Sequence, residues 1–289
     1  METENKTVLT PGNIALAATP IGNPLDASFR LVAALREADL IAAEDTRRVK
    51  RLASELGIRL TARTLAYHEH NEVERTETLL EAARSGQKVL LVTDAGMPVV
   101  SDPGFRAVDA AAREGIAVDV FPGPSAPLTA LVHSGIAPDR FAFEGFLPRT
   151  SSRRLSALES LSREARTLIF FESPRRTREC LEAMVDVFGA EREACVAREL
   201  TKTHEEIVRG TLAELAAWAR ETEVLGEIAI VVAPAPPREE DPADLAALVL
   251  ARAETGERLK DAAKAVAREH ERVSARELYD AALAHKNGG

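Results

Sequence analysis

Four short segments rich in Gly, Pro and Asp each follow an apolar stretch in the first half of the chain. They are 19–24 (TPIGNP), 94–98 (DAGMP), 101–104 (SDPG) and 122–126 (PGPSA). Small molecules bind to open α/β sheets where strands end, because backbone N–H and C=O groups there are still unpaired. Glycine lets a ligand approach the main chain, and proline fixes its path. The four segments together predict one composite pocket, although turns that merely end strands are the alternative for any single segment.

The residue types in these segments predict a ligand that carries few phosphates. The GxGxxG dinucleotide pattern and the GxxxxGK[ST] phosphate loop are both absent from the sequence. Proline also removes N–H donors that a pyrophosphate would need at a helix N-terminus. The carboxylates of Asp94 and Asp102 and the loop carbonyls are acceptors that can pair with an amino group, ribose hydroxyls or a positive centre.

Three further charged groups have the residue types of acid–base or electrostatic catalysis. They are the EDTRR segment at 44–48, Glu172 with the arginines that follow it, and Lys202. A carboxylate can accept a proton, and a cation can stabilise a developing negative charge. For Glu44 and Asp45 a structural role is the alternative, because both can cap the following helix or pair with Arg47 and Arg48.

The distribution of charge points to an anionic partner at one place only. The chain has 289 residues and a formal net charge of −9, which disfavours indiscriminate binding to nucleic acid. The stretch 145–178 nevertheless holds eight Arg and three Glu. Guanidinium groups suit bidentate contact with phosphate, so this stretch predicts a phosphate-binding surface. A solvated helix face with internal salt bridges is the alternative.

The remaining composition excludes several other classes of protein. Cys180 and Cys195 lack CxxC spacing, so we expect buried free thiols and neither a disulfide nor a zinc site. No apolar run reaches the roughly 20 residues that cross a bilayer, and the N-terminus is polar, which predicts a cytoplasmic protein. His68 and His70 lie close together, but no partner with metal-ligand spacing follows them, so no metal is expected.

Apolar runs alternate with helical patterns in the first half of the chain, which predicts a parallel sheet covered on both faces. Strands are expected at 13–19, 40–43, 88–93 and 118–121, and helices at 29–38, 46–56, 71–85 and 105–114. The last two of these strands are expected to be buried. A first domain is predicted at 12–137.

The second half predicts a mixed sheet, because its strands leave room for few helices. Strands are expected at 141–146, 167–171, 194–198, 205–209 and 227–232, with an Arg-rich helix after the first and further helices at 174–188 and 212–220. This second domain is predicted at 138–235, with the boundary near Pro138.

A Pro-rich and charged linker at 233–242 precedes a small helical module at 243–289. Helices are expected at 245–255, 259–269 and 275–284, and Ser274 with Glu277 predicts a capping box. Three such helices can form a helix-turn-helix-like bundle, with a packing or dimerisation role equally open.

Seven strings, in this order and spacing, closely resemble the ribosomal RNA small subunit methyltransferase I family of the tetrapyrrole methylase superfamily. They are ATPIGN, DLIAAEDTRR, LVTDAGMPVVSDPG, FPGPSA, FEGFLPR, FFESPRR and GEIAIVV. The resemblance covers residues 13–232 and implies an α/β, two-domain tetrapyrrole-methylase-like fold. It also implies a cytoplasmic homodimer that uses S-adenosylmethionine. The implied reaction is methylation of the ribose 2′-OH of cytidine 1402 in 16S rRNA.

The resemblance assigns the cofactor contacts, and the charged residue types predict the RNA contacts and the catalytic candidates. The cofactor is expected to contact Pro20, Ile21, Gly22, Asp94, Ala95, Gly96, Met97, Ser101, Gly123, Ser125, Phe171, Glu172, Gly226 and Glu227. RNA is expected to contact Arg47, Arg48, Arg149, Arg153, Arg154, Arg175 and Arg176. Asp45, Glu172 and Lys202 are the candidates that surround the reacting hydroxyl, although alignment in a dry pocket can also suffice without a dedicated base.

Two other function classes remain open at this point. The same fold and cofactor can methylate a tetrapyrrole or another small molecule, and a third possibility is an RNA-binding or ribosome-binding module without activity. Phe143 and Phe146 can stack on bases, although core packing is the favoured interpretation.

Overall fold

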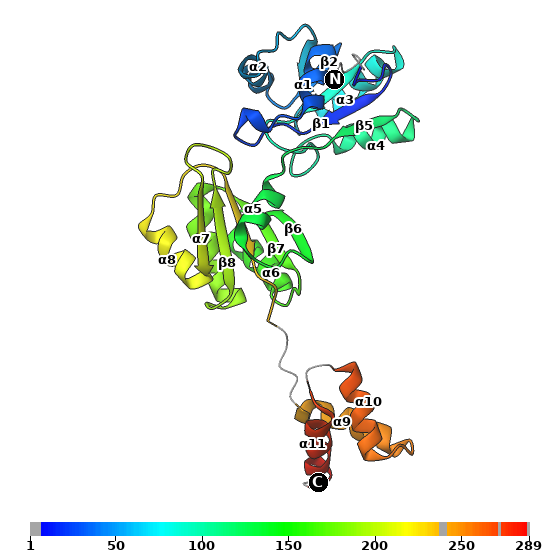
Figure 1. Ribbon diagram of the computed structural model, residues 1–289, viewed down its shortest axis with the longest axis vertical. Helices are drawn as coiled ribbons and strands as arrows, with labels where there is room; N and C mark the ends of the chain where they lie inside the picture. The colour runs from blue at the N-terminus through cyan, green and yellow to red at the C-terminus, as the bar shows by residue number, and fades with distance from the viewer. Residues whose placement is uncertain (1–6, 237–241, 271–272, 288–289) are drawn as a thin grey trace, which may run out of the picture. The chain divides into compact units, whose positions relative to one another are not determined.

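The computed structural model describes residues 7–236, 242–270 and 273–287. The chain forms two compact units, residues 1–235 and 236–289, which are described separately. The first unit contains two sheets with their helices, and the described part of the second unit is helical (Figure 1).

The first sheet is five-stranded and parallel, with the order β3-β2-β4-β1-β5. Its strands are β1 (Ile14–Ala17), β2 (Leu40–Ala43), β3 (Arg63–Ala66), β4 (Val89–Val92) and β5 (Val118–Phe121). The three central strands are buried at every position. Their short, continuous apolar runs fit this place, because helices cover both faces of the sheet.

Two pairs of helices cover this sheet. One face packs against α1 (Phe29–Glu37) and α2 (Thr46–Glu55). The other packs against α3 (Glu72–Arg84) and α4 (Phe105–Arg113). A 3-10 turn, η1 (Pro24–Asp26), precedes α1. The predicted helices are therefore confirmed to within one or two residues.

Two edge strands differ from the sequence-based prediction. Strand β5 was expected to be buried, but it lies at the edge of the sheet and only Phe121 of its four residues is buried. Strand β3 has one buried residue, Leu65, and therefore no apolar run by which to predict it. Edge strands lack a neighbour on one side, so their burial pattern carries less information.

The second sheet has the order β6-β7-β10-β8-β9. Its strands are β6 (Phe141–Phe146), β7 (Thr167–Glu172), β8 (Glu193–Arg198), β9 (Glu206–Thr211) and β10 (Ile228–Val232). Strands β6 and β7 are parallel and the other neighbours are antiparallel, which confirms the predicted mixed sheet.

One face of the second sheet packs against α6 (Ser151–Leu161), α7 (Pro174–Phe188) and α8 (Leu212–Glu221). The other face packs against α5 (Ala126–Ser134), a helix that the sequence analysis did not predict. A boundary near Pro138 would leave α5 in the first domain, whereas Ala130 and Leu131 pack with residues of β7, β8 and β10. The predicted free thiols Cys180 and Cys195 are both buried in this domain.

The second unit consists of α9 (Pro242–Glu254), α10 (Leu259–Glu269) and α11 (Ala275–Asn287) around an apolar core. The predicted capping box is present, because the Glu277 N–H donates to Ser274 Oγ and the Ser274 N–H donates to Glu277 Oε2. Half of the predicted linker, residues 237–241, lies outside the described residues.

Candidate active site

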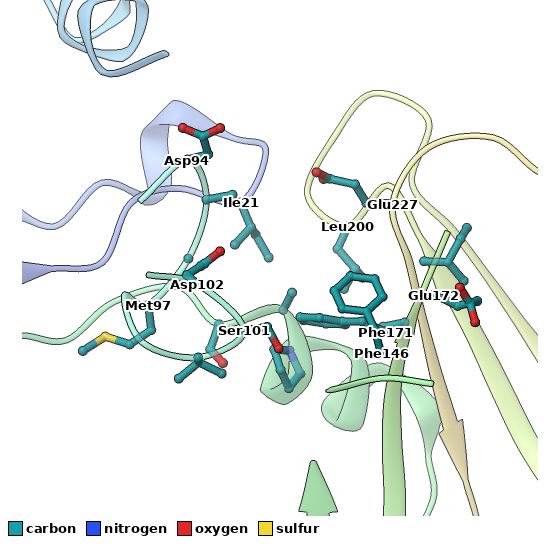
Figure 2. A pocket seen from close by; sticks show the side chains of 18 of the residues that line it. Ile21, Asp94, Met97, Ser101, Asp102, Phe146, Phe171, Glu172, Leu200 and Glu227 are labelled. Atoms are coloured by element: carbon teal, nitrogen blue, oxygen red, sulfur yellow. The ribbon is translucent and has the colours of Figure 1, made fainter. Parts of the chain in front are cut away.

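A cavity of about 470 Å³ lies at the carboxyl ends of strands from both sheets. Ile21 follows β1 and Asp94 follows β4, and both come from the first sheet. Phe146 and Phe171 end β6 and β7 on the opposite wall, together with Leu200 (Figure 2). The central strand order brings the predicted segments to one edge of the first sheet, as parallel strands require.

The loop after β4 has a strained backbone where it borders the cavity. Val99 and Ser101 have positive φ angles of 78° and 63°, which are uncommon for residues with a Cβ. The same loop is tied to the segment after β1 by two backbone hydrogen bonds between Thr19 and Gly96, of 2.9 and 3.0 Å. Strained backbone of this kind is concentrated at functional sites.

Carboxylates dominate the charge of the cavity. Glu44, Asp94, Asp102 and Glu227 line it, and Arg48 is the one cation among the described lining residues. Burial, followed by the charge of Glu44, raises the pKa of Asp102 to about 7. Burial also raises the pKa of Glu44 and of Asp94. Since these surroundings disfavour negative charge, a cationic ligand would stabilise the ionised carboxylates.

The apolar part of the cavity comes mainly from the second domain. The ring of Phe171 lies 5.6 Å from that of Phe146 and 4.9 Å from that of Phe143, measured between centroids. Phe143 packs in the core, as favoured, whereas Phe146 is 58% exposed and lines the cavity. Phe146 is thus the ring that a planar ligand can reach.

Most of the predicted cofactor residues meet in this cavity. Those that line it are Ile21, Asp94, Ala95, Gly96, Met97, Ser101, Ser125, Phe171, Glu172, Gly226 and Glu227. Pro20 and Gly22 instead line a neighbouring cavity of about 380 Å³, and Gly123 lines neither. The structure therefore groups the predicted set without assigning its ligand.

Gly22 has no side chain and so allows the two domains to approach each other closely. A Cβ added at Gly22 would lie 2.8 Å from the carbonyl oxygen of Leu200 and 2.7 Å from Thr201 Oγ1, closer than real Cβ atoms approach. The next residue, Asn23, donates its N–H to Thr201 Oγ1 at 3.1 Å. The requirement for glycine here is thus close approach between loops, and only its neighbour Ile21 faces the first cavity.

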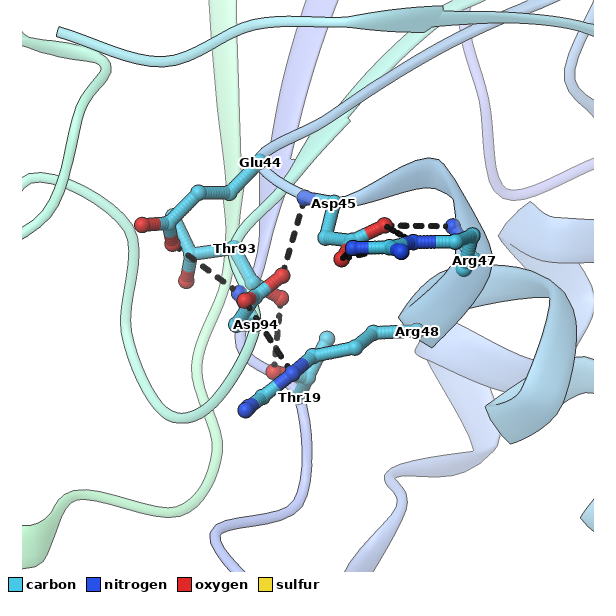
Figure 3. Close-up of polar contacts among 7 residues, drawn as sticks. All are labelled: Thr19, Glu44, Asp45, Arg47, Arg48, Thr93 and Asp94. Atoms are coloured by element: carbon cyan, nitrogen blue, oxygen red, sulfur yellow. Dashed lines mark hydrogen bonds and ion pairs between the residues drawn. The ribbon is translucent and has the colours of Figure 1, made fainter.

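Asp45 caps helix α2 and lines neither cavity. Its Oδ1 accepts the backbone N–H of Arg47 at 2.8 Å, and its Oδ2 lies 2.6 Å from the Arg47 guanidinium (Figure 3). The hydrogen bonds from Arg47 lower the pKa of Asp45 to about 2. These contacts favour the structural role that the sequence left open.

The carboxylate of Glu172 does not face the cavity, which disfavours its predicted catalytic role. Its side chain has no exposed surface, and its Oε2 lies 3.3 Å from the Arg176 guanidinium. Neighbouring residues of a strand point to opposite faces, so Phe171 faces the cavity and Glu172 points away from it (Figure 2). Glu172 belongs to a buried polar cluster with Arg154, Arg176 and Cys180.

We expect Glu172→Gln to lower stability and to leave the chemical step largely intact. The substitution removes the negative charge between Arg154 and Arg176, at a cost of roughly 3 kcal/mol in the free energy of unfolding. Thermal melts should show the loss, while single-turnover rates at a permissive temperature should stay within about threefold. Glu179→Gln, at the exposed partner of Arg154, is the matched control. A rate loss above a hundredfold without a lower Tm would restore the catalytic role.

Lys202 lies in the neighbouring cavity and is held between two carboxylates. Its Nζ is 2.7 Å from Glu199 Oε1 and 2.7 Å from Glu227 Oε2. Burial lowers the pKa of Lys202, but the hydrogen bonds with Glu199 and Glu227 outweigh burial and raise it. Lys202 is therefore a cation at neutral pH, which can stabilise negative charge and cannot accept a proton.

Comparison with known proteins identifies the family. Residues 13–216 match the model for tetrapyrrole (corrin/porphyrin) methylases. A Mycobacterium tuberculosis protein named ribosomal RNA small subunit methyltransferase I is 50% identical, over 95% of this chain and 96% of its own length. The chain belongs to the ribosomal RNA small subunit methyltransferase I family. An Escherichia coli O157:H7 protein of that name is 45% identical, over 94% of this chain and 95% of its own length.

Solved structures of tetrapyrrole methylases confirm the fold. Cobalt precorrin-4 methyltransferase superposes with a TM-score of 0.59 at 18% identity, covering 81% of this chain and 98% of that one. Uroporphyrin-III C-methyl transferase from Thermus thermophilus, complexed with S-adenyl homocysteine, superposes with a TM-score of 0.56 at 20% identity. The superposition covers 76% of this chain and 97% of the Thermus thermophilus chain. At these identities the likeness concerns the fold alone.

The arginines of this methyltransferase family member separate into two groups. Arg149, Arg153 and Arg175 are exposed and have no ion-pair partner among the described residues. Arg154 is buried and pairs with Glu179, which disfavours its predicted contact with RNA. Arg176 is largely buried too, and it donates to the carbonyl oxygens of Leu147 and Pro148 at 3.0 and 2.8 Å. Internal salt bridges, the alternative to a phosphate-binding surface, are thus present in part of the stretch 145–178.

The exposed group gathers around two helix N-termini. Arg149 and Arg153 flank the start of α6, and Arg175 lies in the first turn of α7. Because β6 and β7 are parallel, both helices start at the strand ends that carry Phe146 and Phe171. Neither N-cap residue, Thr150 or Ser173, makes a side-chain capping hydrogen bond. The N–H groups at the start of α6 and the exposed guanidinium groups together favour a phosphate site.

Some lining residues were missed by sequence reasoning. Leu200, Pro127 and Ala229 are ordinary apolar residues whose place depends on the packing of the second domain. Asp102 was noted only as an acceptor, although its position in the SDPG segment was the available signal. Among the described residues no helix is long and apolar enough to span a membrane, and no group of three metal-ligating side chains occurs.

Proposed function

We propose that this chain transfers the methyl group of S-adenosylmethionine to the ribose 2′-OH of a cytidine in 16S rRNA, cytidine 1402 by family resemblance. Relatives named ribosomal RNA small subunit methyltransferase I, 45–50% identical over nearly the whole chain, support this assignment. The observation that carries it is the acidic cavity at the strand ends, with exposed arginines beside it.

The residues of the cavity fit S-adenosylmethionine. The ligand has a positive amino group and a positive sulfonium, and it supplies an electrophilic methyl group when bound. Asp94, Asp102 and Glu227 offer carboxylates to those charges, and Phe146 and Phe171 offer apolar faces to the adenine. A volume of about 470 Å³ lies within the range of small-molecule pockets.

The chain's contribution to the reaction is alignment and charge. An in-line displacement requires the acceptor oxygen, the methyl carbon and the sulfur in one row, which a closed cleft can impose. The apolar wall formed by Ile21, Phe171 and Leu200 excludes water from that row. The hydroxyl proton must leave, and Asp94 and Asp102 are carboxylates at the cavity whose pKa is raised by burial, which makes them stronger proton acceptors.

Methyl transfer to small ribosomal subunits tests this function. Subunits from a strain that lacks the enzyme are incubated with the purified protein and S-[methyl-³H]adenosylmethionine, and uroporphyrinogen is offered in a parallel reaction. We expect the label in rRNA, within an alkali-stable dinucleotide that starts with cytidine, because a 2′-O-methyl group blocks alkaline cleavage. Label in the porphyrin fraction alone would support the tetrapyrrole alternative and overturn the proposal.

The homodimer and the cytoplasmic location remain predictions. Leu25, Phe29 and Val120 are exposed apolar side chains, and the Val120 carbonyl accepts a hydrogen bond from Arg30. This surface is compatible with a second copy of the chain, and sedimentation at micromolar concentration would establish the oligomeric state.

A further inference from the structure

The second cavity, of about 380 Å³, adjoins the first and differs from it in character. Ile21, Arg48, Asp94, Ala95 and Glu227 line both cavities and therefore form the partition between them. Helix α2 supplies much of the remaining wall. A molecule in the second cavity would thus lie next to a ligand in the first cavity, and both would contact these shared residues.

Side chains of both charges line the second cavity. Arg48, Arg51 and Lys202 are its cations, whereas the first cavity has Arg48 alone among its described lining residues. Arg51 is paired with Glu55 at 2.8 Å, and both side chains line the cavity. Such a lining offers donors and acceptors at close spacing, as the polar edge of a nucleobase and a ribose phosphate require.

The wall that carries Lys202 is held in a strained conformation. Glu199 and Thr201 have positive φ angles of 51° and 64°. Their turn is fixed to the first domain by the close approach at Gly22 and by the hydrogen bond from Asn23 to Thr201 Oγ1. Strain that the surrounding contacts maintain in this way is typical of ligand-binding segments.

We propose that the second cavity holds the target nucleotide, unstacked from the RNA, with its ribose against Arg48 and Asp94 in the partition. This inference rests on the proposed function and adds the place of the substrate. A cavity of this size admits one nucleotide, and an enzyme that modifies a nucleotide in folded RNA must first expose it. Arg48 Nε lies 3.3 Å from Asp94 Oδ2, so the cation and the proton acceptor lie side by side in the partition.

The proposed step balances at these residues. The ribose 2′ oxygen forms a bond to the methyl carbon, the carbon–sulfur bond breaks with its electron pair moving to sulfur, and the hydroxyl proton passes to Asp94. Asp94 Oδ1 already accepts the Asp45 N–H at 2.9 Å, which leaves Oδ2 directed to the partition beside Arg48 (Figure 3). Arg48 and Lys202 then stabilise the negative charge that develops on oxygen.

Blocking each cavity separately tests the location. Leu52→Trp places a large ring in the second cavity, and Val100→Trp places one in the first. We expect Leu52→Trp to raise the KM for small subunits at least 10-fold while the Kd for S-adenosylhomocysteine stays within about threefold. Val100→Trp should instead raise the Kd for S-adenosylhomocysteine at least 10-fold while the KM for small subunits stays within about threefold. Equal effects of both variants on the two ligands would overturn the proposal.

A second variant guards against misfolding of Leu52→Trp. The double variant Arg51→Leu, Glu55→Leu removes a surface ion pair without changing the net charge, so we expect it to fold. Its KM for subunits should also rise about 10-fold, with unchanged S-adenosylhomocysteine binding. An unchanged KM would show that the second cavity does not take the nucleotide. The wild-type protein would still methylate rRNA in that case, so the failure is distinct from failure of the proposed function.

Asp94→Asn tests the proton acceptor. The single-turnover rate should fall by about 10²–10⁴-fold, and the rise of that rate with pH should disappear. Asp94→Glu should restore part of the single-turnover rate and part of its rise with pH. A normal pH profile in Asp94→Asn would remove Asp94 from this role.

Discussion

Asp102→Asn is expected to weaken the binding of S-adenosylmethionine by about 10- to 100-fold at pH 8, the loss of one charge-assisted hydrogen bond. Asp102 lines the first cavity, where Glu44, Asp94 and Glu227 also oppose its ionisation. A cationic ligand binds best to the ionised form. Since burial raises the pKa of Asp102 to about 7, wild-type affinity should increase as pH rises through 7.

The same substitution should stabilise the protein without ligand. The folded-state pKa of Asp102, about 7, lies above the ordinary value of 3.8 for an aspartate. Its contribution to stability is therefore complete below about pH 4 and is lost as pH rises through 7. For a partly exposed side chain we expect a gain of about 1–2 kcal/mol at pH 8.

Calorimetry and thermal melts at pH 5.5 and pH 8 measure both effects of Asp102→Asn. The exposed Asp139→Asn is the control, and it should change neither quantity. Wild-type affinity that does not vary with pH, together with an Asp102→Asn protein that melts at the wild-type temperature, would contradict the assignment of Asp102 to the cofactor cavity.

The triple substitution Arg149→Ala, Arg153→Ala, Arg175→Ala is expected to reduce affinity for small subunits by about 10²–10³-fold. These side chains are exposed, lack ion-pair partners within the described part of the chain, and lie at the starts of α6 and α7, whose N-cap side chains make no capping hydrogen bond. If each contacts one phosphate, the slope of log K against log salt should fall by about 2 to 3. S-adenosylhomocysteine binding should not change.

A control with the same loss of charge makes the arginine result specific. Arg113→Ala, Arg220→Ala and Arg276→Ala remove three cations that are paired with carboxylates elsewhere on the surface. Their combination should change subunit affinity by less than about threefold. Equal losses in both triple variants would show that net charge alone governs binding.

The sequence predicted the strands whose burial is complete and missed one edge strand, β3, and one helix, α5. The runs at 40–43 and 89–92 became central strands because apolar residues there are covered on both faces. Strand β3 and helix α5 gave weak signals, since the one is an edge strand and the other begins inside the segment PGPSA. Tertiary packing, which no local pattern records, places α5 on the second sheet.

The sequence predicted the positions of the loops at the candidate site better than the directions of its charged side chains. The segments after β1 and β4 meet because the strand order makes these strands neighbours. Side-chain direction was not available from the sequence. Glu172 and Arg154 therefore looked like surface groups beside a ligand, whereas the alternation of β7 and the packing of α6 on α7 bury them as partners in the core.

A crystal structure of the protein with S-adenosylhomocysteine tests the central claim most directly. We predict that the adenine lies near Phe146 and Phe171, and that the amino group lies within hydrogen-bond distance of a carboxylate among Asp94, Asp102 and Glu227. The sulfur should point to the partition beside Arg48. The nucleoside in the second cavity, or at another surface with the first cavity unchanged, would contradict the account.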